Sequence, residues 1–270
     1  MTLRRHARHR CLRGGLRTGI VVLAIAASGL APAPVSVASQ ERALPEPDSF
    51  YASVRENLAR ADREQYRYAY RERRSDVHTN PFGRLGTDGT LLYEVTPGDE
   101  VGIFYRRLLE RDGKPHTDEK PEKVDRRERG KKPNPSIEDV VGTLDFQIRR
   151  RETVGGRDMI VVEFQPRKDA RPKTRQGRIA KVFKGTAWID EAAREVARVE
   201  ATSIDDISYG FGIVARLGDG TKATLVRERI DSHVWMPTSV QLIGQGRALL
   251  LRRLKIDFAV EWFDYRRTLG

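Results

Sequence analysis

Near its C-terminal end the chain alternates strictly between apolar and polar positions. Five apolar residues alternate here with four polar or small ones: Leu254, Ile256, Phe258, Val260 and Trp262 against Lys255, Asp257, Ala259 and Glu261. Successive side chains of a β-strand point to opposite faces, so residues 248–263 predict a strand with one apolar and one mostly solvated face. Such a strand belongs in an antiparallel sheet, whose apolar face must be closed on itself or covered.

An earlier stretch, Gly185–Ala201, predicts a β-hairpin with a tight polar turn at Glu191–Ala193. Asp190 ends the first strand. It has the chemistry of a catalytic acid, but an aspartate in this position is more often a turn former. The return strand begins at Arg194, and its alternation predicts two faces: Ala197, Val199 and Ala201 on one, and Arg198 and Glu200 on the other.

Similar short runs predict strands over most of the remaining chain, linked by tight turns. We expect nine to eleven strands, including residues 65–71, 90–96, 101–110, 146–153, 159–164, 221–230 and 234–243; residues 205–220 fit a bulged strand or an apolar flap. Two helices are expected, at Asp48–Arg63 with its cap at Asp48 or Ser49, and from Ser136 onward. Their apolar stripes are Phe50, Val54, Leu58 and Ala61, and Ile137, Val140, Val141 and Leu144. Strands and helices do not alternate, so the predicted fold class is mainly β (α+β), without a doubly wound sheet.

Residues 1–38 have the pattern of a secretory signal peptide. Six arginines and no acidic residue precede Ile20–Leu30, an apolar run of 11 that is too short to span a bilayer as a helix. Ser36-Val37-Ala38 predicts cleavage after Ala38; an uncleaved N-terminal anchor is the alternative. We therefore expect a periplasmic or secreted protein with a single domain over residues 39–270. Cys11 is the only cysteine, so that domain has no disulfide.

Residues 39–270 are less basic than the whole sequence. The whole sequence has 50 basic and 38 acidic side chains, a net charge of +12, but residues 39–270 carry only +6. Acidic residues are interleaved with the basic ones, and a nucleic-acid footprint would concentrate Lys and Arg on one face. We therefore expect no nucleic-acid partner. Weak contact with an anionic membrane surface, screened by salt, is compatible with this charge.

Residues 111–135 form a strongly charged insertion in which Val124 is the only aliphatic residue. A short helix near residues 121–129 is possible by its start signal, but no face of it would be apolar. The insertion cannot bury much area, so we expect it to be mobile. It is either a lid or partner-binding arm, or a solvated charged loop.

No pattern typical of an enzyme occurs in residues 39–270. The histidines His78, His116 and His233 are scattered, and without cysteines a zinc site is not expected. Nucleophile-elbow, Ser-x-x-Lys and phosphate-binding loop motifs are absent from the sequence. We expect no cofactor, no metal and no catalytic activity. A hydrolase whose site is assembled from distant carboxylates is the alternative that sequence patterns do not detect.

Several of these features occur together in a known family. They are the helix at Asp48–Arg63 followed by Tyr66-Arg67-Tyr68, the hairpin Gly185…Trp188-Ile189-Asp190…Arg194…Val196…Arg198, the Asp219-Gly220 turn, the Trp235-Met236-Pro237-Thr238 strand and the terminal strand. In this order they resemble the outer-membrane lipoprotein carrier family with its LolA/LolB-like fold. The chain looks closer still to uncharacterised secreted bacterial members. The resemblance covers most of residues 48–265 and implies a large antiparallel sheet, curled into an unclosed barrel and covered by two or three helices.

The resemblance also implies a function. We expect an exported, non-catalytic protein that binds or carries a lipid or another hydrophobic ligand, such as lipoprotein acyl chains, in a concave sheet cavity. The candidate lining residues are Trp188, Leu254, Ile256, Phe258, Val260 and Trp262; alternatively, these six are ordinary core. A second hypothesis is a cell-envelope sensor or adaptor that uses the same fold to bind a protein partner, with the charged insertion as the contact.

Overall fold

The computed structural model describes residues 42–80, 83–84, 89–116, 120–125, 135–209, 215–248 and 252–268. The chain divides into two compact units, Met1–Arg42 and Ala43–Gly270, and the second contains the fold described below. The predicted signal peptide, its cleavage site and Cys11 lie outside the described residues.

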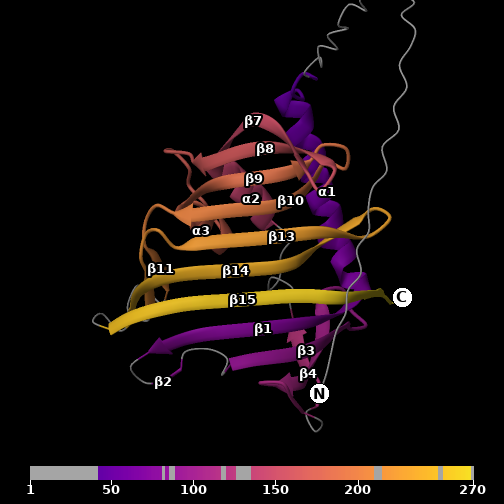
Figure 1. Ribbon diagram of the computed structural model, residues 1–270, viewed down its shortest axis with the longest axis vertical. Coiled ribbons are helices and arrows are strands. Elements are labelled where there is room, and N and C mark those ends of the chain that lie inside the picture. The colour runs from indigo at the N-terminus through magenta and orange to yellow at the C-terminus, as the bar shows by residue number, and fades with distance from the viewer. Residues whose placement is uncertain are drawn as a thin grey trace, which may run out of the picture. The chain divides into compact units, whose positions relative to one another are not determined.

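The fold is mainly β, as predicted, with one antiparallel sheet (Figure 1). Its main path runs β5 (Lys114–Pro115), β4 (Ile103–Arg111), β3 (Gly89–Pro97), β1 (Tyr68–Asn80), β15 (Arg252–Arg267), β14 (Val234–Ala248), β13 (Lys222–Asp231), β10 (Glu195–Ser203), β9 (Phe183–Asp190), β8 (Arg157–Pro166) and β7 (Leu144–Val154). Four short strands pair beside this path: β2 (Gly83–Arg84), β6 (Glu122–Asp125), β11 (Ile207–Tyr209) and β12 (Ala215–Leu217). In the described part of the chain β7 and β5 do not pair with each other, so the sheet is not closed.

Three α-helices lie on one face of this sheet (Figure 1). They are α1 (Pro47–Glu64), α2 (Pro135–Thr143) and α3 (Arg175–Ala180). The cap of α1 is Glu46 rather than the predicted Asp48 or Ser49, because its carboxylate accepts hydrogen bonds from both of those amides. No helix among the described residues has the length and apolar character needed to cross a membrane.

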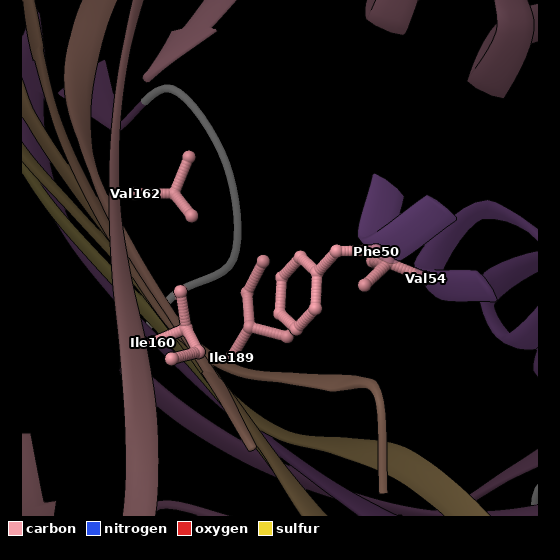
Figure 2. Packing of buried hydrophobic residues seen from close by; sticks show 5 residues of the cluster. All are labelled: Phe50, Val54, Ile160, Val162 and Ile189. Atoms are coloured by element: carbon pink, nitrogen blue, oxygen red, sulfur yellow. The ribbon is translucent and has the colours of Figure 1, made fainter. Parts of the chain in front are cut away.

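The longest helix docks on the sheet through the apolar stripe predicted from its sequence. Phe50 and Val54 of α1 pack against Ile160 and Val162 of β8 and Ile189 of β9, and all five side chains are buried. Figure 2 shows the Phe50 ring directed from the helix toward Ile189. This contact fixes α1 across the β8–β9 side of the sheet.

A second cluster fills the same face of the sheet further along, near β1, β3 and β4. Tyr70, Val95 and Phe104 are its buried centre, and Tyr66, Tyr93, Val124, Trp262 and Tyr265 pack around them. Tyr66 belongs to a short 3-10 helix, η1 (Gln65–Arg67), so the strand predicted from residue 65 begins three residues later, at Tyr68.

The predicted hairpin at Gly185–Ala201 is present as β9 and β10, but one of its predicted faces is wrong. A bulge between Val196 and Arg198 shifts the register of β10 against β9. Ala197 therefore packs with Met159, Trp188 and Trp235 on the face away from the helices. Val199 and Ala201 stay on the helix-covered face, where both border a cavity.

Two segments between the predicted elements also differ from expectation. Residues 122–125 form a strand, β6, paired with β4, not the start of a helix, because Val124 packs beside Phe104 in the aromatic cluster. Residues 117–119 and 126–134 of the charged insertion lie outside the described residues. The segment after β8 contains a helix, α3, that no predicted element covers, and Thr174 caps it by accepting a hydrogen bond from the Gly177 amide at 3.0 Å.

Candidate ligand cavity

A cavity of about 930 Å³ lies between the three helices and the β7–β10 and β13 part of the sheet. Its lining is mostly apolar. The apolar side chains around it are Pro47, Tyr51, Val54, Leu58, Val140, Val141, Leu144, Phe146, Val162, Phe164, Ile179, Ala180, Phe183, Ala187, Ile189, Val196, Val199, Ala201, Ala223 and Leu225. The polar residues that border it are Asp48, Arg55, Asp145, Arg167, Gln176 and Arg227.

Small side chains on paired strands form the sheet wall of the cavity. Val199 pairs with Leu225, and Ala201 pairs with Ala223, so these four residues share one face of β10 and β13. Ala187 of β9 pairs with Val199 and continues the wall. Alanine and valine fill little of the space above a sheet, and this leaves room between the strands and the helices.

The opposite wall comes from the helices. Tyr51 and Leu58 of α1, Val140 and Val141 of α2, and Ile179 of α3 border the cavity. Burial raises the pKa of the Tyr51 phenol.

A carboxylate ties the two shorter helices together. Asp139 of α2 accepts hydrogen bonds from the Thr174 hydroxyl at 2.6 Å and from the amides of Lys173 and Thr174. These bonds lower the pKa of Asp139, with the Thr174 hydroxyl as the largest cause. Gly177 allows this approach, since a Cβ atom there would clash with the Asp139 carboxylate.

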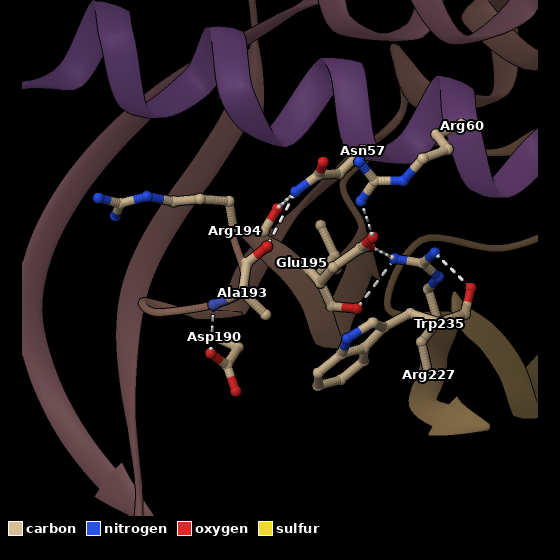
Figure 3. Close-up of polar contacts among 9 residues, drawn as sticks. Asn57, Arg60, Asp190, Ala193, Arg194, Glu195, Arg227 and Trp235 are labelled. Atoms are coloured by element: carbon tan, nitrogen blue, oxygen red, sulfur yellow. Dashed lines mark hydrogen bonds and ion pairs between the residues drawn. The ribbon is translucent and has the colours of Figure 1, made fainter. Parts of the chain in front are cut away.

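A buried ion pair lies at the floor of the cavity (Figure 3). Arg227 donates from Nη1 to Glu195 Oε2 at 2.9 Å and from Nη2 to the carbonyl oxygen of Trp235, also at 2.9 Å. Arg60 of α1 approaches Glu195 at 3.7 Å. Burial raises the pKa of Glu195, while the charge of Arg227 opposes that rise. The floor therefore contains a compensated charge pair rather than an isolated charge.

The turn of the β9–β10 hairpin holds α1 in place above this floor (Figure 3). Asn57 donates from Nδ2 to the carbonyl oxygens of Ala193 and Arg194, at 2.9 and 3.0 Å. Arg194 has a positive φ of 57° and lies over the Phe50 ring. Asp190 accepts a hydrogen bond from the Ala193 amide at 2.8 Å, which confirms its predicted role as a turn former.

The lining combines many apolar side chains with a few polar ones. The described residues that line the cavity include no serine, cysteine or histidine, and Arg227 is already paired with Glu195. Within the described ranges, no group of three or more histidine, cysteine, aspartate or glutamate side chains is arranged to hold a metal ion. Apolar contact is the interaction that this lining offers most.

The candidate lining residues whose side chains are described are distributed over both faces of the sheet. Phe258 and Val260 share the cavity face, because Val260 pairs with Val240, which pairs with Leu225. Trp262 also lies on that face but packs into the aromatic cluster. None of these three is among the residues that line the cavity.

Of the other three candidates, one lies on the opposite face of the sheet and two have side chains that are not described. Trp188 lies on the opposite face, next to Met159 and Trp235, and its indole Nε1 donates to Glu152 at 2.9 Å. Leu254 and Ile256 are in β15, but their side chains lie outside the described ones.

This cavity is lined by none of the candidates whose side chains are described, and the assignment of all six to a ligand site stays a prediction. The lining residues missed as a site include Ala187, Val196, Ala223 and Leu225, and those of α3. A signal was present, since small aliphatic residues recur at alternate positions of β9, β10 and β13, where β15 has large ones.

Comparisons with known proteins find similarity only at the level of structure. No protein-family model matches the chain, and no curated protein sequence matches it. A domain named for outer membrane lipoprotein sorting, from Vibrio parahaemolyticus, is similar at 12% identity and a TM-score of 0.37, over 81% of this chain and 92% of that one. A LolA superfamily protein from Nitrosomonas europaea is similar at 14% identity and a TM-score of 0.33, over 81% and 93%.

A third similar structure is that of MucB in complex with MucA(peri), at 11% identity and a TM-score of 0.26, over 81% of this chain and 99% of that one. The superfamily that the sequence resembles is thus among the similar structures. The TM-scores of these three structures are all below 0.5, so the similarity concerns the fold alone.

Proposed function

We propose that this protein binds and carries a lipid or another hydrophobic ligand in the cavity between its helices and its sheet. The observation that carries the proposal is the cavity itself, with a volume of about 930 Å³ and a mostly aliphatic lining. Protein interiors are normally close-packed, with few voids larger than a water molecule. Ligand pockets have volumes of roughly 300–1,000 Å³, so this one is at the large end of that range.

The physical basis of such binding is burial of apolar surface. Each Å² of apolar ligand surface removed from water contributes roughly 25 cal/mol. The lining has few directional partners, because Arg227 and Glu195 satisfy each other and Asp145 accepts a hydrogen bond from Arg167. Selection would therefore depend on the length and width of an apolar chain more than on hydrogen bonding.

The proposed role is non-catalytic and exported. It needs no nucleophile, and the described lining contains no serine, cysteine or histidine. The pattern of residues 1–38 supports a periplasmic or secreted location, where a hydrophobic molecule crossing an aqueous space has to be shielded from water.

Filling the cavity tests the proposal. The double variant Ala201→Trp/Ala223→Trp places two indole rings on the wall between β10 and β13. Titration with the neutral fluorescent probe N-phenyl-1-naphthylamine should show binding by the wild type and a loss of at least about tenfold in the variant. The matched control is Thr224→Trp, which adds an indole on the same strand but on the opposite face, and it should bind like the wild type.

Two results would overturn the proposal. One is equal probe binding by the wild type and the filled variant, which would locate the binding elsewhere. The other is the absence of probe binding by a folded wild-type protein. An unoccupied cavity together with a stable complex with another envelope protein would support the sensor or adaptor hypothesis instead.

A further inference from the structure

One segment at the rim of the cavity carries an excess of positive charge equal to the net charge of the domain. Residues 39–270 contain 44 basic and 38 acidic side chains. The stretch from Arg167 to Lys181, here called the basic segment, accounts for seven of the basic ones and a single acidic one, Asp169. The rest of residues 39–270 is therefore balanced, with 37 of each.

The basic segment differs from the rest of the surface in how many of its cations form ion pairs. Elsewhere many arginines pair with carboxylates, as Arg74 does with Glu72, Arg107 with Glu94 and Arg149 with Glu163. In the basic segment the side chain of Arg167 pairs with Asp145. Five other exposed cations form no ion pair with any carboxylate of the described residues: Lys168, Arg171, Lys173, Arg178 and Lys181.

The position of the basic segment links it to the cavity. Arg167, Gln176, Ile179 and Ala180 belong to it and line the cavity wall. Arg55 of α1 borders the same cavity and is likewise exposed without an ion pair in the described part of the chain. An apolar space and unpaired cations therefore occur side by side.

The acidic groups near the rim do not cancel this charge. Asp139 is engaged by the Thr174 hydroxyl and two amides, which hold the basic segment against α2. Asp145 is paired with Arg167. Asp169 and Glu138, which are exposed, and Asp48, which borders the cavity, are further acids here, and they are outnumbered by the five cations and Arg55.

We propose that the basic segment and Arg55 form a docking surface for an anionic lipid membrane, which brings the rim of the cavity against the bilayer. The exposed cations are spread over a loop and a helix. This area is larger than one phosphate group can contact. A membrane surface supplies many anionic head groups at once, and each Lys or Arg near it strengthens binding roughly fivefold, the equivalent of about 1 kcal/mol. This inference rests on the proposed function, because a hydrophobic cargo would enter the cavity from that membrane.

Vesicle binding tests the inference with a charge-matched pair of variants. Lys168→Gln/Arg171→Gln/Lys173→Gln removes three cations of the basic segment whose side chains make no hydrogen bond among the described residues. Lys222→Gln/Arg229→Gln/Lys255→Gln removes three exposed cations from β13 and β15, so the change in net charge is the same. Both variants and the wild type are measured by co-sedimentation with phosphatidylglycerol–phosphatidylcholine vesicles and with phosphatidylcholine vesicles alone.

We expect the wild type to prefer the anionic vesicles, with a preference that falls as salt is added. The basic-segment variant should bind them on the order of 100-fold more weakly, following the contribution of each cation. The control variant should lose no more than about threefold, because its cations lie on β13 and β15, outside the basic segment. Equal losses in the two variants, or a wild type without preference for anionic vesicles, would overturn the inference.

Two further measurements separate this inference from its alternatives. Soluble dihexanoyl-phosphatidylglycerol distinguishes a membrane from a single head group: a loss of its binding in the basic-segment variant as large as the vesicle loss would overturn docking in favour of a head-group site. Binding of N-phenyl-1-naphthylamine reports on the cavity separately. Probe binding with no vesicle preference defeats only the docking surface, whereas vesicle preference with no probe binding defeats only the cargo function.

Discussion

The two halves of one sheet face are filled in opposite ways. On β9, β10 and β13 the face carries small or aliphatic side chains such as Ala187, Ala201 and Ala223, and a cavity remains beneath the helices. On β1, β4 and β15 the same face carries Tyr70, Phe104 and Trp262, whose rings pack into a closed core. The pairs Leu225–Val240, Val240–Val260 and Val260–Arg74 carry this face from one half to the other.

The difference shows that side-chain volume, rather than the sheet itself, decides where a cavity forms. Both halves contain a buried carboxylate that is compensated by arginine: Glu195 with Arg227 in the cavity half, and Glu72 with Arg74 in the aromatic half. Glu72 also accepts a hydrogen bond from the Trp262 indole at 3.0 Å. The polar framework is thus similar, and the space above it is not.

Truncating one side chain in each half should give the largest contrast. Phe104 is fully buried, so Phe104→Ala should lower the free energy of unfolding by about 3–5 kcal/mol. Leu225 already borders open space, so Leu225→Ala should cost about 2 kcal/mol, the low end for such a truncation. Urea denaturation followed by circular dichroism measures both. Similar losses would mean that the cavity half is packed as tightly as the aromatic half.

Breaking the ion pair at the cavity floor should have the next largest effect. Glu195→Ala leaves Arg227 buried without its carboxylate and should cost about 3 kcal/mol. The cost is at the lower end of the usual range because Arg227 keeps its hydrogen bonds to the carbonyls of Val196 and Trp235. The double variant Glu195→Met/Arg227→Met should recover most of the loss. An equal loss in the single and double variants would rule out an uncompensated charge as the cause.

A smaller effect should appear in the pH dependence of the helices above the cavity. The pKa of Asp139 is lowered in the folded protein, so Asp139 stabilises the fold above its unfolded pKa, near 3.8, and this contribution is lost as the pH falls through the folded pKa. Asp139→Asn should therefore flatten the decline of the urea midpoint between about pH 5 and pH 2. Glu138→Gln, an exposed change on the same helix, should keep the wild-type decline. A variant at Asp139 with an unchanged decline would assign the acid sensitivity to other groups.

The sheet could be predicted because period-two alternation is a local property of a strand. Local exceptions are not visible in that pattern: the bulge after Val196 turns Ala197 to the other face, and six residues are too few for α3 to show a helical period. Val124 looked isolated in a charged stretch because the side chains it packs with, around Phe104, lie on another strand.

The location of the cavity could not be predicted from the strands alone. Phe258, Val260 and Trp262 are on the apolar face, as expected, but whether such a face becomes core or cavity depends on what lies opposite. For Trp262 the opposing rings come from η1, β1 and β4. Opposite Ala201 and Ala223 lie helices that leave the space partly open.

The most direct measurement is native mass spectrometry of the protein, purified from a bacterial periplasm without detergent, followed by solvent extraction. We expect bound lipid masses in the wild type and in Thr224→Trp, and their loss in a folded Ala201→Trp/Ala223→Trp variant. A wild-type protein that has no added mass, and gains none after incubation with lipid vesicles, would contradict a hydrophobic cargo in this cavity.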